Sequence, residues 1–315
     1  MVDISVIVPV YNERESVKAL YSRLVGVLHE LGKTYEIIFV DDGSRDGSLE
    51  VLKDLNSRDD SVRIIRFRRN FGQTAAMDAG FKNASGKTIV SMDADLQNDP
   101  SDIPTLLDRM DEGFDAVCGW RYDRKDSIPK RIMSLVANKM RNILVGDSIH
   151  DSGCSLRAYT SEAAKDLELY GEMHRYIPTL LMWKGYRVSE VKVKHHPREH
   201  GKTKYGAGRL LRGMLDLITV KFLVTYNSSP LHLFGIPGII STATGLMISA
   251  YLAYIRVVHY EPISSRPLLS LGVLLILLGV QFISIGLLGE LITNRFFAES
   301  NLSTRRQYSI KEIIE

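Results

Sequence analysis

The chain has 315 residues, enough for one sizeable globular domain and a further segment. Lysine and arginine exceed the acidic residues by only three, so bulk charge gives no case for nucleic-acid binding. The two cysteines, Cys118 and Cys154, lie far apart without metal-binding spacing, which argues against a disulfide framework and favours a reducing compartment. Because residues 1–3 lead directly into a strand pattern, we expect no signal sequence.

Strand and helix patterns alternate along residues 4–119. The apolar run over 4–10 is typical of a buried parallel strand, and apolar residues at helical spacing predict a helix from Val17 to Leu31. Further elements follow: strand 35–40, helix 47–57, strand 62–67, helix 73–84, strand 87–92, helix 101–112 and strand 115–119. This alternation predicts right-handed βαβ units and an α/β fold with a mostly parallel sheet.

The loops that follow the predicted strands carry the unusual polar sequences. They cover residues 9–13, 41–47, 68–74 and 93–99. Ligands of open α/β sheets bind in the crevice outside the carboxyl ends of the strands. We therefore expect the functional residues to lie in these loops.

The loop at 93–99 carries oxygen ligands that suit a divalent cation. Asp93, Asp95 and Gln97 alternate after an apolar run, so an extended chain would place them on one face. Two carboxylates and an amide oxygen suit Mg²⁺ or Mn²⁺ and leave coordination positions for a diphosphate. The alternative is a loop that uses aspartate only for turns and caps, but its position between a strand and a helix cap at 99–102 argues against this.

The loop after the first strand argues against two nucleotide-binding classes. Its sequence, Pro-Val-Tyr-Asn-Glu, is neither a glycine-rich dinucleotide turn nor a P-loop, which disfavours NAD enzymes and P-loop NTPases. Aromatic and acidic side chains can hold a nucleotide instead: Tyr11 can stack on a base, Asp42 can accept from a base N–H, and Glu13 can bind a ribose hydroxyl. The alternative is that Pro9 only ends a strand and that the acidic residues of 41–46 serve turns.

The chain is strongly apolar over residues 231–292. Before this region, residues 207–224 predict an amphipathic helix on a membrane interface, with a core helix as the alternative. Leu233–Val258 and Leu268–Ile292 are each long enough to cross a bilayer. Lysine and arginine flank both outer ends, whereas the short connecting loop carries only Arg266. The positive-inside rule then places both termini in the cytoplasm.

Seven motifs occur in the order in which family-2 glycosyltransferases have them. They are Pro9-Val10-Tyr11-Asn12-Glu13, Val40-Asp41-Asp42-Gly43-Ser44, Arg69-Asn70-Phe71-Gly72-Gln73, Asp93-Ala94-Asp95-Leu96-Gln97, Gly119-Trp120-Arg121, the run from Asp151 to Arg157, and the run from His196 to Tyr205. The full set resembles the polyprenyl-phosphate glycosyltransferases, over about residues 3–295. Two departures are Asp99, where the family usually has proline, and His150, where it often has glutamine.

The resemblance implies a Rossmann-like GT-A catalytic fold with a metal site for Mg²⁺ or Mn²⁺ at Asp93, Asp95 and Gln97. The donor-binding residues that it implies are Pro9, Tyr11, Glu13, Val40, Asp42, Asp93, Ala94, Asp95, Arg198 and Lys204. The domains expected are a cytoplasmic GT-A domain at 1–205, an interfacial amphipathic helix at 206–230, a two-helix transmembrane hairpin at 231–292 and a cytoplasmic tail at 293–315.

Positive side chains are expected around an acceptor phosphate, because a dianion must be held beside a second anion. By resemblance the acceptor-phosphate residues are Arg121, Lys130, Arg131, Ser134 and Arg175. The loop after Arg121 varies in length, which leaves Lys130 and Arg131 as alternatives. Asp151 is a base or an acceptor-orienting residue, with a structural cap as the alternative. The catalytic residues expected are Asp93, Asp95, Arg121 and Asp151.

The resemblance implies inverting, metal-dependent transfer of a monosaccharide from a nucleotide sugar to a polyprenyl phosphate in a membrane. Two spans resemble the bacterial undecaprenyl-phosphate enzymes and favour a UDP-sugar such as UDP-glucose; a GDP-mannose-dependent dolichyl- or polyprenyl-phosphate mannose synthase is the alternative. A processive polysaccharide synthase is disfavoured, because neither Trp120 nor Trp183 lies in a Gln-x-x-Arg-Trp motif. A non-enzymatic membrane scaffold predicts loss of the Asp93/Asp95 pair or of the basic set around Arg121, and both are intact here. A homo-oligomer is compatible with the sequence.

Overall fold

The computed structural model describes residues 2–122, 149–197, 230–260, 262, 267–299 and 310–314. The chain divides into two compact units. The sheet unit contains Met1–Val220 together with Arg306–Glu315, and the hairpin unit contains Lys221–Arg305. Both ends of the chain therefore belong to the sheet unit.

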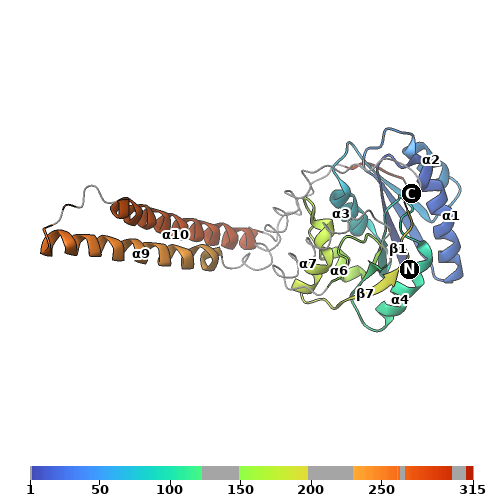
Figure 1. The fold of residues 1–315 in the computed structure, drawn as a ribbon. Coiled ribbons are helices and arrows are strands. Elements are labelled where there is room, and N and C mark those ends of the chain that lie inside the picture. Colours follow the sequence, from blue (N-terminus) through green and yellow to red (C-terminus); the bar gives the residue numbers. More distant parts are fainter. Residues whose placement is uncertain are drawn as a thin grey trace. The chain divides into compact units, whose positions relative to one another are not determined.

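Among the described residues, eight strands form one mixed sheet (Figure 1). They are β1 (Ile4–Val10), β2 (Tyr35–Asp41), β3 (Val62–Phe67), β4 (Thr88–Ser91), β5 (Ala116–Arg121), β6 (Arg157–Thr160), β7 (Val188–Val193) and β8 (Ile310–Ile314). Their spatial order is β7-β5-β6-β4-β1-β2-β3-β8. Strands β6 and β8 run antiparallel to their neighbours, and the other pairs are parallel. The predicted α/β fold with a mostly parallel sheet is confirmed.

Helices cover both faces of this sheet. Those of the sheet unit are α1 (Arg14–Glu30), α2 (Ser48–Asn56), α3 (Gln73–Asn83), the 3₁₀ turn η1 (Pro100–Asp102), α4 (Ile103–Asp111), α6 (Ser161–Lys165), the 3₁₀ turn η2 (Met173–Tyr176) and α7 (Ile177–Trp183). Every strand and helix predicted between residues 4 and 119 is present with closely matching bounds.

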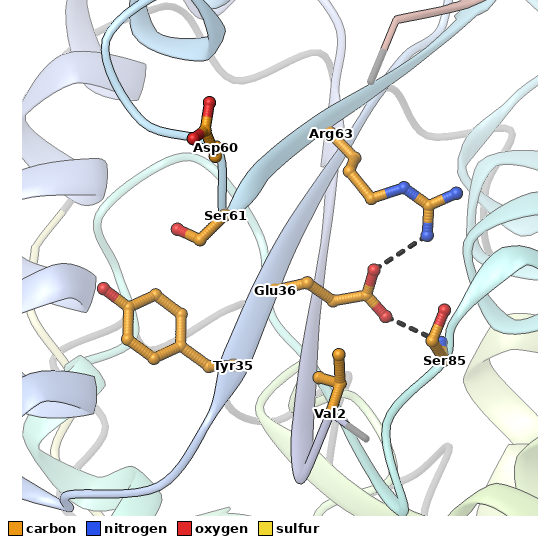
Figure 2. A pocket seen from close by; sticks show the side chains of 7 residues that line it. All are labelled: Val2, Tyr35, Glu36, Asp60, Ser61, Arg63 and Ser85. Atoms are coloured by element: carbon orange, nitrogen blue, oxygen red, sulfur yellow. Dashed lines mark hydrogen bonds and ion pairs between the residues drawn. The ribbon is translucent and has the colours of Figure 1, made fainter.

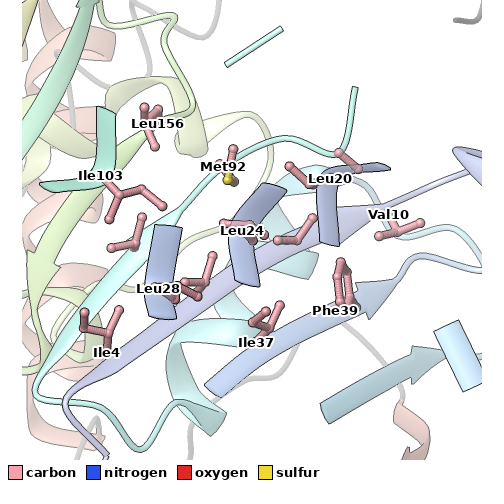
Figure 3. Close-up of a cluster of buried hydrophobic side chains, with 14 of the residues drawn as sticks. Ile4, Val10, Leu20, Leu24, Leu28, Ile37, Phe39, Met92, Ile103 and Leu156 are labelled. Carbon is pink, nitrogen blue, oxygen red and sulfur yellow. The ribbon is translucent and has the colours of Figure 1, made fainter. Parts of the chain in front are cut away.

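The main core lies between the sheet and helix α1 (Figure 3). The helical spacing of Leu20, Leu24 and Leu28 places these side chains on one face, where they are fully buried. Alternate residues of β1, such as Ile4 and Val10, point into the same cluster. Because both faces of β1 are buried, its sequence is a continuous apolar run.

Helix α3 covers the other face of β1 and approaches it closely. A side-chain carbon at Gly80 would lie 2.2 Å from Cγ2 of Ile7, so a larger residue would push α3 off the sheet. Gln73, the first residue of α3, lies beside the carboxyl ends of β1 and β4, where the polar loops begin.

Strand β8 is a part of the sheet that the sequence patterns did not predict. It lies in the segment expected to be a tail, and it pairs antiparallel with β3, with Ile314 opposite Ile64. The last described strand of the chain thus covers an edge that β3 would otherwise leave open.

A buried ion pair stabilises the edge of the sheet where β2 and β3 begin (Figure 2). Glu36 accepts hydrogen bonds from Ser5 Oγ at 2.5 Å, from the Ser85 main-chain N–H at 2.6 Å and from Arg63 Nη1 at 2.7 Å. Glu36, Arg63 and Ser85 line a pocket, but the polar loops lie at the opposite ends of the parallel strands. The network is therefore structural. Burial opposes ionisation, but the three hydrogen bonds outweigh it and hold the pKa of Glu36 below its ordinary value.

We expect Glu36→Gln to lower the free energy of unfolding at pH 7 by roughly 3 kcal/mol, because it leaves Arg63 half-buried without its carboxylate. Since folding lowers the pKa of Glu36, the ionised group stabilises the fold above about pH 4.5, and this contribution is lost as the pH falls through the lowered pKa. The difference in the free energy of unfolding between Glu36→Gln and the parent should therefore shrink as the pH is lowered. This free energy is measured by denaturant unfolding, followed by the fluorescence of Trp120 and Trp183. The exposed Glu168→Gln is the control. A constant deficit at all pH values would contradict the prediction.

The hairpin unit consists of two long helices, α9 (Pro230–Val258) and α10 (Pro267–Glu299). Both are long and apolar enough to cross a membrane, by length and composition. Where α9 begins, the Leu231 main-chain N–H donates to Oε2 of Glu290 at 3.4 Å. Further along, Ser241 Oγ donates to the Leu275 carbonyl of α10 at 2.8 Å.

Glycines on each helix let the two backbones approach each other. A side-chain carbon at Gly238 would lie 2.8 Å from the Gly279 carbonyl oxygen, and one at Gly245 would lie 2.6 Å from that of Gly272. At Gly279 it would lie 2.1 Å from Oγ1 of Thr242. Small residues at such crossings are typical of helices that pack within membranes, where close contact replaces the hydrophobic effect.

Gly279→Leu is expected to separate the two helices, at a cost of about 1–3 kcal/mol or more, because the added side chain meets backbone atoms of α9. A cysteine pair introduced at Ser241 and Leu275 should cross-link readily in the parent, since these residues are in contact. The yield should fall several-fold when Gly279→Leu is added. Leu at the adjacent exposed position, Val280→Leu, is the matched control. An unchanged yield in the Gly279→Leu protein would show that the close crossing is not required.

Candidate active site

Asp93 and Asp95 lie just beyond the carboxyl end of β4. The sequence predicts a strand that ends at residue 92, and β4 ends at Ser91. An extended chain beyond the strand would place Asp93, Asp95 and Gln97 on one face, but the following residues form a turn. Leu96 has a φ of 61°, in the left-handed region. The turn, rather than strand alternation, therefore determines where these oxygens lie.

The two carboxylates influence each other. Burial and the negative charge of Asp95 together raise the pKa of Asp93 to about 6, against the opposite effects of Ser155, Arg121 and Arg157. Oδ1 of Asp93 accepts a hydrogen bond of 2.6 Å from Nε2 of Gln73, the first residue of α3. Two mutually repelling carboxylates in one place favour a bound cation.

The oxygen ligands here fit a divalent cation. Oδ1 of Asp95 accepts only from the Gln97 main-chain N–H, at 3.2 Å, and within the described part of the chain its other oxygen receives no hydrogen bond. The described residues contain no cluster of three or more histidine, cysteine, aspartate or glutamate side chains that could hold a metal ion. The Gln97 amide remains the predicted third ligand. A hard-oxygen set of this composition suits Mg²⁺ or Mn²⁺.

Arg121, at the end of β5, is held by Asp151. Its Nε donates to Oδ2 of Asp151 at 2.7 Å and its Nη2 to Oδ1 at 2.9 Å, a bidentate ion pair. The Gly153 main-chain N–H also donates to Oδ1, at 3.2 Å. Both oxygens of Asp151 are engaged and only 4% of the residue is exposed, so Asp151 holds the Arg121 guanidinium in one orientation.

Glu190 of β7 holds the loop that carries Asp151. Its carboxylate accepts from the main-chain N–H groups of His150 and Asp151, at 2.9–3.2 Å, and contacts Nδ1 of His150 at 2.9 Å. The His150 ring stacks on Trp120, with ring centroids 4.3 Å apart. Glu190 was not predicted, because it lies in a strand pattern without a motif.

Arg157 is a buried cation that sequence patterns did not single out, although it ends one of the motifs. It is 2% exposed and donates to the carbonyls of His174 and Ser152, at 2.8 and 2.6 Å. Its Nε, buried, has no hydrogen-bond partner among the described residues. Because β6 runs antiparallel to β4 and β5, its first residue lies at their carboxyl ends, close enough for its charge to lower the pKa of Asp93.

On the other side of β4, the predicted nucleotide loops contact one another. Both oxygens of Asp42 accept main-chain hydrogen bonds, from Phe71 at 2.6 Å and Gly72 at 2.9 Å. Burial raises the pKa of Asp42 to about 6, against these two bonds, which favour the charged form. Asp42 thus holds the loop before α3, and acceptance from a base N–H stays a prediction.

The loop after β1 is fixed to the loop after β2. The Asn12 main-chain N–H donates to Ser44 Oγ at 3.0 Å, and Asn12 Oδ1 accepts from the Arg45 main-chain N–H at 2.8 Å. Asn12 has a φ of 55°, a conformation that asparagine tolerates better than most residues. The neighbouring Tyr11 and Glu13 are half-buried beside this junction.

The remaining predicted residues divide by location. Val40 and Ala94 are buried, and half-buried Pro9 lies opposite Val40 in the sheet, so all three lie at the carboxyl ends of strands. Arg175, in η2, pairs with Glu172 at 2.8 Å. The other predicted phosphate-binding residues lie outside the described residues: Lys130, Arg131, Ser134, Arg198 and Lys204. Most of the predicted amphipathic helix, 206–230, lies outside them as well.

Asp99, one of the departures from the family pattern, links the acidic loop to the end of β7. It caps η1 by accepting from the Ser101 main-chain N–H at 2.9 Å, as the sequence predicted, and its Oδ2 lies 3.1 Å from Nε2 of His196. The His196 main-chain N–H donates to the Gln97 carbonyl at 2.9 Å. The segment that leads to Arg198 thus begins at the candidate metal loop.

Comparison with known proteins identifies relatives along the whole chain. The family model for glycosyl transferase family 2 matches residues 5–168. The dodecaprenyl-phosphate galacturonate synthase of Rhizobium johnstonii is 38% identical, over 99% of this chain and 93% of its own. The undecaprenyl-phosphate 4-deoxy-4-formamido-L-arabinose transferase of Edwardsiella ictaluri is 36% identical, over 99% and 94%.

Solved structures share the fold at low sequence identity. A crystal structure of glucosyl-3-phosphoglycerate synthase from Mycobacterium tuberculosis, in complex with Mn²⁺, UDP and glucosyl-3-phosphoglycerate, matches with a TM-score of 0.56. The identity is 16%, and the match covers 72% of this chain and 82% of the other. The same enzyme in complex with Mg²⁺ and UDP matches with a TM-score of 0.53.

Proposed function

Because the chain belongs to glycosyl transferase family 2, we propose that it transfers one sugar from a nucleotide sugar to the phosphate of a membrane polyprenyl phosphate. One observation carries this proposal: the Asp93–Asp95 pair and the oriented guanidinium of Arg121 lie at the same edge of the sheet, close enough for Arg121 to lower the pKa of Asp93. This reaction requires two neighbouring sites. Carboxylates hold the metal ion that binds the donor diphosphate, and a cation beside them binds the acceptor phosphate.

The names of the relatives support the class of acceptor. The two relatives that match nearly this whole chain act, by name, on dodecaprenyl phosphate and undecaprenyl phosphate. Both matches extend through the apolar helices as well as the sheet unit, since they cover 99% of this chain. A long-chain polyprenyl phosphate is therefore the proposed acceptor.

The donor side of the reaction depends on Asp93, Asp95 and Gln97. A divalent cation held by these residues would neutralise the leaving nucleoside diphosphate as a Lewis acid. Gln73 orients Asp93 through its 2.6 Å hydrogen bond. Asp42 holds the adjoining loop, so that Tyr11 and Glu13 can bind the nucleoside.

The acceptor side depends on Arg121. An oxygen of the lipid phosphate forms the new bond to the anomeric carbon while the bond from that carbon to the diphosphate breaks, which inverts the anomeric centre. A phosphate monoester, with a second pKa of about 6, is largely ionised at neutral pH, so no general base is needed. Asp151 acts as a positioning residue: it fixes the Arg121 fork that binds the phosphate. Lys130 or Arg131, Ser134 and Arg175 remain proposed acceptor contacts, and Arg198 and Lys204 proposed donor contacts.

The identity of the donor is a finer proposal. We infer a UDP-sugar rather than GDP-mannose. The two relatives that match nearly the whole chain are bacterial polyprenyl-phosphate enzymes, and neither is named as a mannose synthase. Their names specify galacturonate and 4-deoxy-4-formamido-L-arabinose, so these sugars and the glucose predicted from the sequence are the candidates to compare.

The membrane arrangement follows from the same chain. We propose that α9 and α10 cross the membrane as a hairpin and that the sheet unit faces the cytoplasm. The pairing of β8 with β3 supports a shared side for both termini, because the strands nearest the two ends belong to one sheet. The positive residues outside the apolar region support the cytoplasmic side.

Calorimetric binding of UDP and GDP to the detergent-solubilised protein, with and without Mn²⁺, tests the donor site. Mn²⁺-dependent binding of UDP with weak binding of GDP is expected, and the reverse would favour mannose transfer. Incubation with undecaprenyl phosphate and UDP-glucose, UDP-galacturonate or UDP-4-deoxy-4-formamido-L-arabinose then identifies the sugar by the mass of the lipid product. Failure to bind either nucleotide would overturn the proposed function in favour of a membrane scaffold.

A further inference from the structure

Helix α10 packs on α9 through one face only. The residues of α10 that contact α9 there include Gly272, Ile276, Gly279, Ile283 and Gly286. Their spacing alternates between four and three residues, which keeps them on one side of a helix. This face is the inner seam.

The opposite face of α10 carries a second seam with the same spacing. This outer seam consists of Leu271, Leu274, Leu278, Gln281, Ile285, Leu288 and Ile292, and all seven are exposed. At roughly 100° of rotation per residue, its centre lies on the side of α10 turned away from α9. A seam of six apolar residues and one amide at regular heptad positions is the pattern with which helices pair.

Gln281 is the feature that a lipid-facing surface does not explain. It lies near the middle of the candidate span Pro267–Ile292, about 17–21 Å along the helix from the two ends, so its side chain cannot reach the membrane surface. Within the described part of the chain its amide makes no hydrogen bond. The hydroxyl of nearby Ser284 instead bonds to the Val280 carbonyl of its own helix, at 2.9 Å. In hydrocarbon, an amide without a partner is costly.

We propose that α10 pairs with α10 of a second copy of this chain along the outer seam, with the Gln281 amides hydrogen-bonded to each other in the membrane interior. The pairing rests on the proposal that α10 crosses the membrane, and it is independent of which sugar is transferred.

A second copy fits this surface for two reasons. Copies in one membrane have the same orientation, so paired α10 helices run parallel and each seam position meets its own counterpart across a two-fold axis. A glutamine amide has both a donor and an acceptor, so Gln281 is complementary to itself. A single polar residue in an otherwise apolar seam also fixes the register of the pair.

Fluorescence energy transfer measures this association. Donor- and acceptor-labelled copies of the full chain are reconstituted together in liposomes at a low protein-to-lipid ratio. Gln281→Leu removes both amide hydrogen bonds and is expected to weaken association roughly tenfold. Gln281→Asn keeps an amide and should retain most of the transfer. Ser284→Leu removes a neighbouring polar group outside the seam and should leave the transfer unchanged. Association of Gln281→Leu at the parental level would overturn the proposal.

Cross-linking distinguishes the outer seam from other faces of α10. A cysteine at Leu278 should form an intermolecular disulfide under mild oxidation, whereas one at Leu287, exposed on another side of the helix, should not. The native Cys118 and Cys154 are buried, so the parent provides the background. Preferential cross-linking through Leu287→Cys would overturn the seam. Flotation of each protein with its liposomes tests the membrane premise separately, and a protein that fails to float would overturn that premise and with it the pairing.

Discussion

Replacing Asp95 by asparagine is expected to lower the rate of sugar transfer about a thousandfold. The substitution keeps the size of the side chain but removes one of the two negative charges that would hold the cation. Metal ions supply several kcal/mol of charge stabilisation to reactions of this type, and each 1.36 kcal/mol is about a tenfold change in rate. Among the described residues Asp95 accepts one hydrogen bond, from the Gln97 main-chain N–H, so the substitution is expected to cost little folding energy.

Two measurements separate the loss of the metal from a general defect. Initial rates with undecaprenyl phosphate and the nucleotide sugar give the loss of transfer. Calorimetry should show that Asp95→Asn no longer gains UDP affinity when Mn²⁺ is added. Asp108→Asn, an aspartate exposed on α4, is the matched control and should behave as the parent does. Near-parental transfer by Asp95→Asn would refute the metal assignment.

Arg121→Ala is expected to reduce kcat/KM for the lipid acceptor by about two to three orders of magnitude, with UDP affinity changed little. In the proposed function, the guanidinium supplies a charge-assisted contact to the acceptor phosphate. The variant also leaves Asp151 buried without its partner, which costs roughly 3–5 kcal/mol of stability. A loss of activity in Arg121→Ala alone is therefore ambiguous.

The double variant Arg121→Ala/Asp151→Ala resolves this ambiguity. Removing both members of the ion pair should recover much of the stability, as followed by the fluorescence of Trp120 and Trp183, but none of the acceptor use. Arg121→Lys keeps the positive charge but loses the bidentate guanidinium, so it should rescue part of the activity. Asp151→Asn should raise the KM for the lipid while UDP binding stays the same. If the double variant regained transfer together with stability, Arg121 would have only a structural role.

The location of the site could be predicted because its parts follow strands whose patterns are strong. Strands β1, β2, β4 and β5 are continuous apolar runs, and parallel strands bring their carboxyl ends to one edge. Asp93 and Asp95 follow β4, and Arg121 ends β5. Their proximity therefore depended only on the order and direction of the strands.

The residues that support the site could not be predicted in the same way. Arg157 reaches the site because β6 is antiparallel, and an apolar pattern does not reveal the direction of a strand. Glu190 acts through main-chain N–H groups of a distant loop. Gln73 depends on how closely α3 packs on the sheet, which Gly80 determines. Each of these contacts is set by tertiary packing rather than by a local pattern.

The pairing of β8 with β3 has a consequence for the order of assembly. A ribosome completes β3 early and β8 among the last residues of the chain, after both apolar helices have been made. Until then, β3 presents an unpaired edge, which is a surface that aggregating strands and chaperones recognise. The sheet can therefore close only in a molecule whose two apolar helices have already been synthesised, so the completion of the sheet is timed by the translation of the hairpin unit.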